Sequence, residues 1–84
     1  MYEILIERRA EKDLRRLAAE IFQRLIAAIQ ALADDPRPDG CKKLTGSEND
    51  WRIRVGDYRV LYEIDDKNQI VRILRVRHRR EAYR

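Results

Sequence analysis

The sequence has few of the residues on which cofactor, metal and disulfide chemistry depend. With one cysteine and one histidine among 84 residues, it offers neither an internal disulfide nor a Cys/His metal cluster. Its three glycines form no Gly-rich phosphate-binding loop. No run approaches the ~18 apolar residues of a membrane-spanning helix, and no secretory signal pattern opens the sequence. These absences predict a cytoplasmic protein without membrane segment, metal or cofactor.

Charge is what the sequence has in excess. Charged residues make up 40% and hydrophobic residues 44% of the chain, whereas about 25% charged is usual for a globular domain. The apolar content suffices for one small core, so residues 1–84 are predicted to form a single domain. The net charge of +4 favours polyanions or an acidic protein as partners.

The first half of the chain changes its hydrophobic period. Residues 2–7, apolar in the middle, predict a strand. From Ala10 to Leu32 the apolar side chains recur at three- and four-residue steps, which is typical of one helical face. The pattern leaves open one long helix or a hairpin of two. A single helix of about 25 residues would be about 38 Å long and would overhang so small a core, so we favour a hairpin that bends near Ala19 or Glu20.

The second half predicts loops and strands. Residues 34–50 hold both prolines and two of the three glycines, so they are predicted to be a loop, with Cys41 as an ordinary loop residue. Alternating residues 51–55 and 58–64 flank Gly56-Asp57, which suits a two-residue type II′ turn. This is the clearest hairpin in the chain.

A third strand, residues 70–76, follows the turn at 65–68 and is apolar on both faces. The order of elements predicts an α+β fold: an N-terminal strand, a helical hairpin, then a three-stranded antiparallel meander. Together the strands form a mostly antiparallel four-stranded sheet with helices on one face. The other face is left for function.

The hairpin register places two arginines against each other. A two-residue turn pairs Arg54 with Arg59 on one face of the hairpin, and Arg52 extends the stripe. The other face carries the pairs Val55–Tyr58, Ile53–Val60 and Trp51–Tyr62. Directly opposed like charges destabilise a sheet by up to about 1 kcal/mol, which favours an anion bound between the arginines. The alternative is a solvated face with two splayed side chains.

The C-terminal tail is also basic. It carries Arg77, Arg79, Arg80 and Arg84 around His78 and Tyr83. Arginine suits bidentate phosphate binding, an aromatic ring suits stacking on a base, and His78 is a candidate acid or base. The alternatives are a solvated chain end, a docking site for an acidic protein, and a His that is merely packed at a strand end.

Two segments resemble the RelE/ParE superfamily of toxins from type II toxin–antitoxin systems: WRIRVGDYRVLY at 51–62 and ILRVRHRREAY at 73–83. The likeness extends over nearly the whole chain through LADDP and KKLTG. It implies a helical hairpin on a curved sheet. For the RelE-like branch, it implies a metal-independent endoribonuclease that cuts messenger RNA in the ribosome. There the 2′-hydroxyl attacks the adjacent phosphate and leaves a 2′,3′-cyclic phosphate.

The resemblance carries roles over to Arg52, Arg54, Arg59, Arg79 and Tyr83. Our hypothesis is that Arg59 and Arg79 hold the scissile phosphate and that Tyr83 or the neighbouring His78 moves the proton. Arg52 and Arg54, joined by Arg77 and Arg80 of the basic tail, are the RNA-binding positions. Two departures matter: Arg52 and Arg54 stand where the best-known branch often has lysine, and arginine does not act as a general base. The spacing from Arg79 to Tyr83 is also shorter than in that branch.

The resemblance further implies partners and rivals. The partners are a cognate acidic RelB-like antitoxin that folds around the toxin, the ribosome and messenger RNA. One rival interpretation is a ParE-like inhibitor of DNA gyrase on the same fold. The other is a catalytically weak RNA-binding relative, suggested by the missing lysines.

Overall fold

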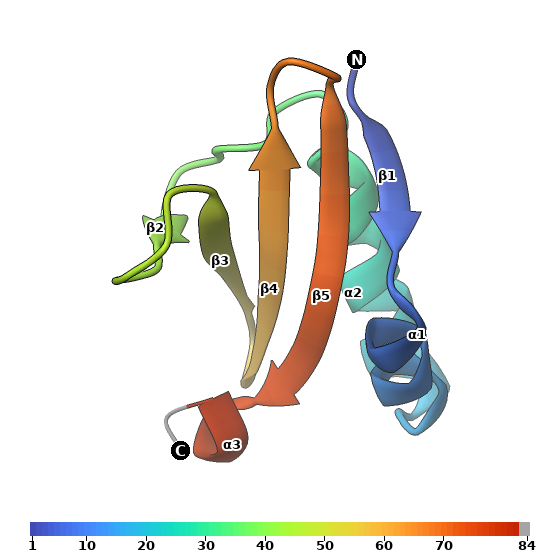
Figure 1. Ribbon diagram of the computed structural model, residues 1–84. Helices are drawn as coiled ribbons and strands as arrows, with labels where there is room; N and C mark the ends of the chain where they lie inside the picture. Colours follow the sequence, from blue (N-terminus) through green and yellow to red (C-terminus); the bar gives the residue numbers. More distant parts are fainter. Residues whose placement is uncertain (83–84) are drawn as a thin grey trace.

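The fold is a sheet with two helices on one face. The computed structural model describes residues 1–82, and Figure 1 views it from the face that the longer helices leave open. The elements are, in order, β1 (Glu3–Ile6), α1 (Arg8–Arg15), α2 (Ala19–Ala31), β2 (Lys42–Lys43), β3 (Asp50–Val55), β4 (Tyr58–Asp65), β5 (Ile70–His78) and α3 (Arg79–Ala82).

The sheet has the order β1-β5-β4-β3-β2. Only β1 and β5 run parallel, and the remaining neighbours are antiparallel. The predicted α+β class and mostly antiparallel sheet are therefore confirmed. The sheet has one strand more than predicted, because Lys42–Lys43, in the segment predicted to be a loop, pairs with β3. Cys41, just before this strand, is half-buried and packs against the core.

The helical region is a hairpin, as predicted. The break lies between Arg15 and Ala19, just before the predicted bend. Ala18, with φ −60° and ψ 150°, is the N-cap residue of α2. Since no Gly or Pro marks this break, packing is the remaining cause: Leu17 leaves the helical path and packs against the core.

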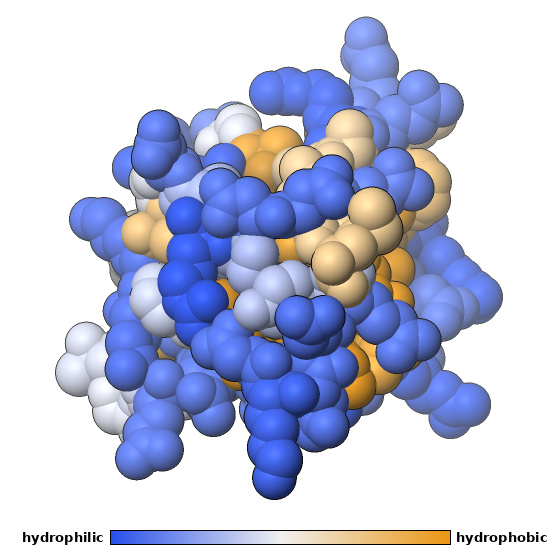
Figure 2. All heavy atoms as spheres, turned by 90° about the horizontal axis from the view of Figure 1, so that it is seen from above, coloured by the Kyte–Doolittle hydropathy of each residue, from blue (hydrophilic) through white to orange (hydrophobic). Residues whose placement is uncertain are grey.

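One hydrophobic core joins the helices to the sheet. Its buried members are Ala10, Leu14, Leu25, Ile29, Leu32, Ile53, Val60, Tyr62, Ile64, Val71, Ile73 and Val76. Hydrophilic atoms dominate the end of the molecule in Figure 2, with apolar atoms showing between them. Among the described helices, none is long and apolar enough to cross a membrane.

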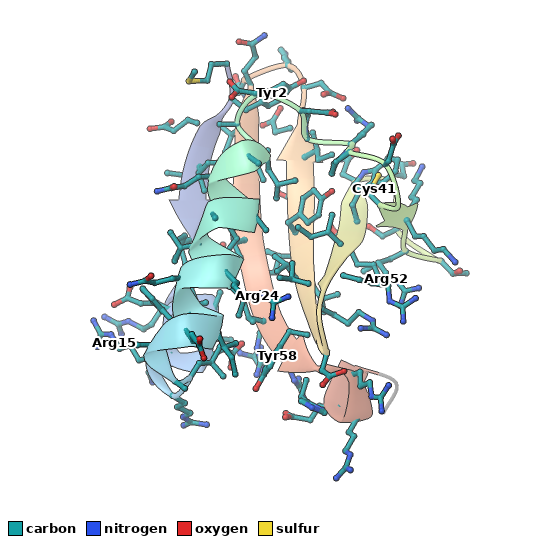
Figure 3. All side chains as sticks on the ribbon, turned by 180° about the vertical axis from the view of Figure 1, so that it is seen from behind. Tyr2, Arg15, Arg24, Cys41, Arg52 and Tyr58 are labelled. Atoms are coloured by element: carbon teal, nitrogen blue, oxygen red, sulfur yellow. The ribbon has the colours of Figure 1, made fainter. Side chains whose placement is uncertain are left out.

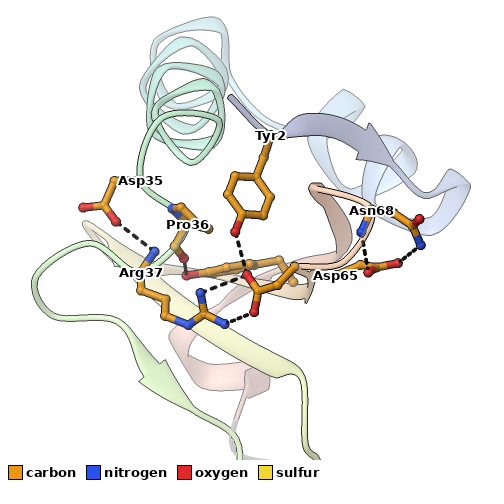
Figure 4. A network of polar contacts seen from close by, with 8 residues as sticks. Tyr2, Asp35, Pro36, Arg37, Asp65 and Asn68 are labelled. Atoms are coloured by element: carbon orange, nitrogen blue, oxygen red, sulfur yellow. Dashed lines mark hydrogen bonds and ion pairs between the residues drawn. The ribbon is translucent and has the colours of Figure 1, made fainter.

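A polar network closes one end of the sheet (Figure 4). The Tyr2 hydroxyl donates to Asp66 at 2.6 Å, and the Arg37 guanidinium donates to both oxygens of the same carboxylate at 3.2 and 2.8 Å. Arg37 also lies over the Trp51 ring, 5.0 Å from its centre. The segment before β2 is therefore fixed to the β4–β5 turn and to β3, which brings β2 to the sheet edge.

Candidate nucleic-acid interface on the open face of the sheet

Three arginines form a row across the open face. Arg54 of β3 lies opposite Arg59 of β4, and Arg59 lies opposite Arg77 of β5. Their neighbours Ile53, Val60 and Val76 point into the core, so the arginines point to the other side. The predicted hairpin register is confirmed at every pair, and Gly56 has the φ of +60° that a type II′ turn requires.

The central member of the row is buried. Arg59 is 2% exposed, and its Nη1 lies 3.5 Å from the carbonyl oxygen of Tyr58. A guanidinium keeps its charge in any protein environment, so this position holds a desolvated cation between two others. Such an arrangement favours a bound anion, because a phosphate oxygen offsets the repulsion along the row.

Carboxylates neutralise the β5 side of this face. Arg72 pairs with Glu63 at 2.6 Å and lies 3.4 Å from Glu7. Arg77 donates to Glu81 at 3.3 Å. Arg54, by contrast, has no carboxylate within ion-pair distance among residues 1–82. Arg54 on β3 therefore carries a positive charge that no carboxylate of residues 1–82 offsets at ion-pair distance.

Arg52 begins a second row, one step along the face. It lies opposite Leu61 of β4, and Leu61 lies opposite Arg75 of β5. The guanidinium of Arg75 is held by Asp13, whose hydrogen bonds raise the pKa of Arg75 further. Figure 3 shows Arg52 at the β3 side of the sheet. In this second row Arg52 extends the arginine stripe predicted from the hairpin, whereas the guanidinium of Arg75 is bound to Asp13.

Arg79 and Arg80 follow β5 on the short helix α3. The backbone N–H of Arg79 donates to the carbonyl oxygen of Asp57 at 2.7 Å, and its Nε lies 4.0 Å from the Asp57 carboxylate. This attaches α3 to the β3–β4 turn, at the end of the sheet that carries Arg54 and Arg59. A depression of about 600 Å³ lies there, lined by Asp57, His78, Arg79, Arg80 and Glu81. Arg79 and Arg80 are both exposed.

His78 lies on the other face from the arginine row. It pairs with Tyr58, a residue packed against the core, and the two rings meet edge to face with centres 5.2 Å apart. The Nδ1 atom accepts a hydrogen bond from the backbone N–H of Arg80 at 3.2 Å. The proton of the neutral imidazole is then on Nε2. The structure thus brings His78 to Tyr58 and α3 rather than to Arg59.

Two of the sequence-based assignments concern the C-terminal segment after Val76. Tyr83 lies outside the described residues. Arg77 was assigned to a tail, but β5 continues through His78 and places Arg77 in the row. The alternation Val76-Arg77-His78 was the available signal for a longer strand. Within residues 1–82 no group of three or more His, Cys, Asp or Glu side chains is placed to hold a metal ion.

Comparison with known proteins relates this fold to one family of toxins. Residues 4–83 match the family described as the ParE toxin of type II toxin–antitoxin systems. The chain is 33% identical over 84 residues to toxin RelG of Mycobacterium tuberculosis, covering 99% of this chain and 97% of RelG.

Two solved structures are similar throughout. A chain of the archaeal RelE–RelB complex from Pyrococcus horikoshii superimposes with a TM-score of 0.84 at 28% identity, covering 95% of this chain and 97% of that one. A chain of the toxin–antitoxin complex RelBE2 from Mycobacterium tuberculosis gives 0.82 at 32% identity, covering 92% and 96%.

Proposed function

The chain belongs to the ParE toxin family and is a RelE-type toxin of a type II toxin–antitoxin system, and from this premise we propose that it is a ribosome-dependent endoribonuclease. The observation that carries the proposal is the row Arg54–Arg59–Arg77, with its buried central cation. Three cations side by side on one face are suited to binding the phosphates of RNA, whereas inhibition through protein contact does not require such a row.

The proposed reaction is an internal transfer within the RNA. The 2′-oxygen attacks the adjacent phosphorus, the bond to the 5′-oxygen breaks, and the products are a 2′,3′-cyclic phosphate and a 5′-hydroxyl. Arg59 and Arg79 hold the non-bridging oxygens and offset the negative charge that grows on them in the transition state. Arg52, Arg54, Arg77 and Arg80 bind the neighbouring backbone. The step uses the substrate's own hydroxyl and is proposed to need no metal.

Two protons must move in this step: one leaves the 2′-hydroxyl and one reaches the 5′-oxygen. Arg52 and Arg54 do not serve as general bases, so Tyr83 and His78 are the candidates. Because His78 lies on the face opposite the arginine row, against Tyr58, we assign the transfers at the scissile phosphate to Tyr83 rather than to His78. A set this weak leaves much of the acceleration to the ribosome, which holds the messenger in line for attack.

The proposed partner that silences the toxin is an acidic antitoxin. The matched solved structures from Pyrococcus horikoshii and Mycobacterium tuberculosis are complexes of toxin with antitoxin. The net charge of +4 of this chain suits an acidic segment that folds on binding. A toxin that acts on the ribosome works in the cytoplasm, which is where we place this protein.

Primer extension on ribosome-bound message tests the proposal. Wild-type protein is expected to cut the message, Arg79→Ala to lose at least 100-fold in rate, and Arg15→Ala, an exposed arginine on α1, to cut normally. Naked RNA is expected to be cut poorly. Equal rates on naked and ribosome-bound RNA would contradict the proposed dependence on the ribosome.

A gyrase supercoiling assay beside it tests the rival function, because the family description names the ParE toxin. Gyrase inhibition without RNA cleavage would replace the proposal with the gyrase-directed function. Neither activity would leave an RNA-binding relative that does not cleave.

A further inference from the structure

The short strand β2 adds a lysine to the arginine face. Lys42 lies directly opposite Arg52, and Lys43 lies directly opposite Trp51. In an antiparallel pair, directly opposed side chains are on the same face of the sheet. Lys42 therefore shares the open face with Arg52. Lys43 shares the helix-covered face with Trp51, which packs against the core.

Lys42 is placed to bind an external anion. Its side chain is exposed, and its ammonium has no hydrogen bond or ion pair within residues 1–82. The pair Lys42–Arg52 is the third like-charged cross-strand pair described on this face, after Arg54–Arg59 and Arg59–Arg77. Opposed like charges destabilise a sheet, so a repeated instance on one face indicates a polyanion rather than a single ion.

The spacing of the two rows fits a nucleic-acid backbone. Arg52 and Arg54 are two residues apart on β3, which separates their rows by about 6.8 Å. Successive phosphates of an extended single strand have a similar spacing. We infer that Lys42, together with Arg52, binds a backbone phosphate beside the scissile phosphate that Arg59 holds. The inference rests on the proposed function, since it requires RNA on this face.

A lysine at this place differs from the arginines around it. Its ammonium is a compact point charge on a flexible stem, which binds phosphate without the fixed fork of a guanidinium. Lysine on an edge strand also discourages pairing with other sheets. Lys43 protects the sheet edge in the same way. Edge protection therefore does not explain why Lys42 lies on the face that carries Arg52.

The test is the salt dependence of RNA binding, measured by fluorescence anisotropy. The probe is a labelled single-stranded 2′-O-methyl RNA, which lacks the attacking hydroxyl, so binding is read without cleavage. Each phosphate contact to a single strand contributes about 0.7 to the slope of log K against log salt concentration. Lys42→Ala is expected to make the slope shallower by about 0.7, Lys43→Ala to keep the wild-type slope, and Lys42→Arg to restore it.

The outcomes separate this inference from the proposed function. Wild-type protein that binds the probe, with Lys42→Ala showing the wild-type slope, overturns the role of Lys42 and leaves the ribonuclease proposal standing. Equal losses in Lys42→Ala and Lys43→Ala overturn it as well, because the effect would then be one of net charge. Wild-type protein that does not bind the probe overturns the inference, whereas the ribonuclease proposal is decided by primer extension on ribosome-bound message. Thermal unfolding of each variant checks that β2 is retained.

Discussion

Asp13 on α1 holds Arg75 on β5, although the two residues are far apart in the sequence. Its carboxylate accepts from Nε of Arg75 at 2.9 Å and from Nη2 at 3.2 Å, and it also accepts from the backbone N–H of Val76 at 2.9 Å. The parallel neighbour β1 ends opposite Ile73. Asp13 thus accepts a hydrogen bond from the backbone of β5 at Val76, beyond the end of the neighbouring strand β1. Arg77 is the next residue along β5.

Removing this carboxylate is expected to destabilise the protein. Asp13→Ala leaves the Val76 N–H and a half-buried guanidinium without their acceptor, which costs about 2–3 kcal/mol in the free energy of unfolding. The matched control is Glu11→Ala, which removes an exposed partner of Arg15 on the same helix and should cost less than about 0.5 kcal/mol. Urea unfolding measures both. Equal small losses would show that Asp13 is only a surface charge.

The same carboxylate predicts a pH dependence. Burial on its own raises the pKa of Asp13, but the hydrogen bonds from Arg75 and Val76 and the charge of Arg75 outweigh it, so the pKa lies below the ordinary 3.8. A lowered pKa in the folded state gives stability that is present above the unfolded value and is lost as the pH falls through the folded value. The stability difference between wild type and Asp13→Asn should be constant near neutral pH and narrow in that acidic window. A difference that stays constant down to low pH would contradict this.

Arg59 is expected to lower the stability of the fold and to raise the rate of RNA cleavage. Arg59→Met keeps an unbranched side chain but removes a buried cation that lies between Arg54 and Arg77. Apolar replacement of buried charge often stabilises a protein, here by about 1 kcal/mol, while loss of a phosphate donor lowers the cleavage rate by about 100- to 1000-fold. Thermal unfolding and primer extension on the same preparation test the two halves. A variant that is both unstable and inactive would show that Arg59 is a structural residue.

Tyr62 is expected to stabilise the fold through the hydrogen bond of its hydroxyl group. The fully buried ring directs its hydroxyl to the carbonyl oxygen of Pro36 at 2.7 Å, and burial raises the pKa of the phenol above its ordinary value. Tyr62→Phe should cost about 1–2 kcal/mol, because the Pro36 carbonyl loses its donor. Tyr58→Phe is the control, since the Tyr58 hydroxyl has no hydrogen-bond partner within residues 1–82. Equal effects of the two substitutions on unfolding would refute the assignment.

Glu81 is expected to compete with RNA for Arg77. The two side chains are linked at 3.3 Å on adjoining elements, and the carboxylate is largely exposed. Glu81→Gln should tighten binding of the uncleavable RNA by about two- to fivefold, in keeping with the small value of an exposed ion pair. Glu11→Gln breaks an exposed pair of the same spacing on α1 and should leave affinity unchanged. If both variants gain alike, the cause is net charge rather than access to Arg77.

Local rules determined a large part of the fold and part of the candidate site. The hairpin register follows from a two-residue turn, in which Gly56 adopts a backbone conformation that other residues avoid. Once that turn is fixed, alternation alone places Arg54 against Arg59. The helical hairpin likewise follows from its periodic apolar face and the small size of the core.

Tertiary structure decided what depended on distant pairing. Arg77 joins the row only through the β4–β5 register, which shifts by a bulge at Leu61/Tyr62, and a bulge is set by how the whole sheet curves. Lys42 lies on the open face only because β2 pairs with the edge of β3. This strand has two residues and is too short to give a periodic signal in the sequence. Asp13 meets Arg75 only because α1 packs where β1 ends. The sequence by itself therefore determined the first two arginines of the row, whereas long-range packing determined which other charges stand beside them.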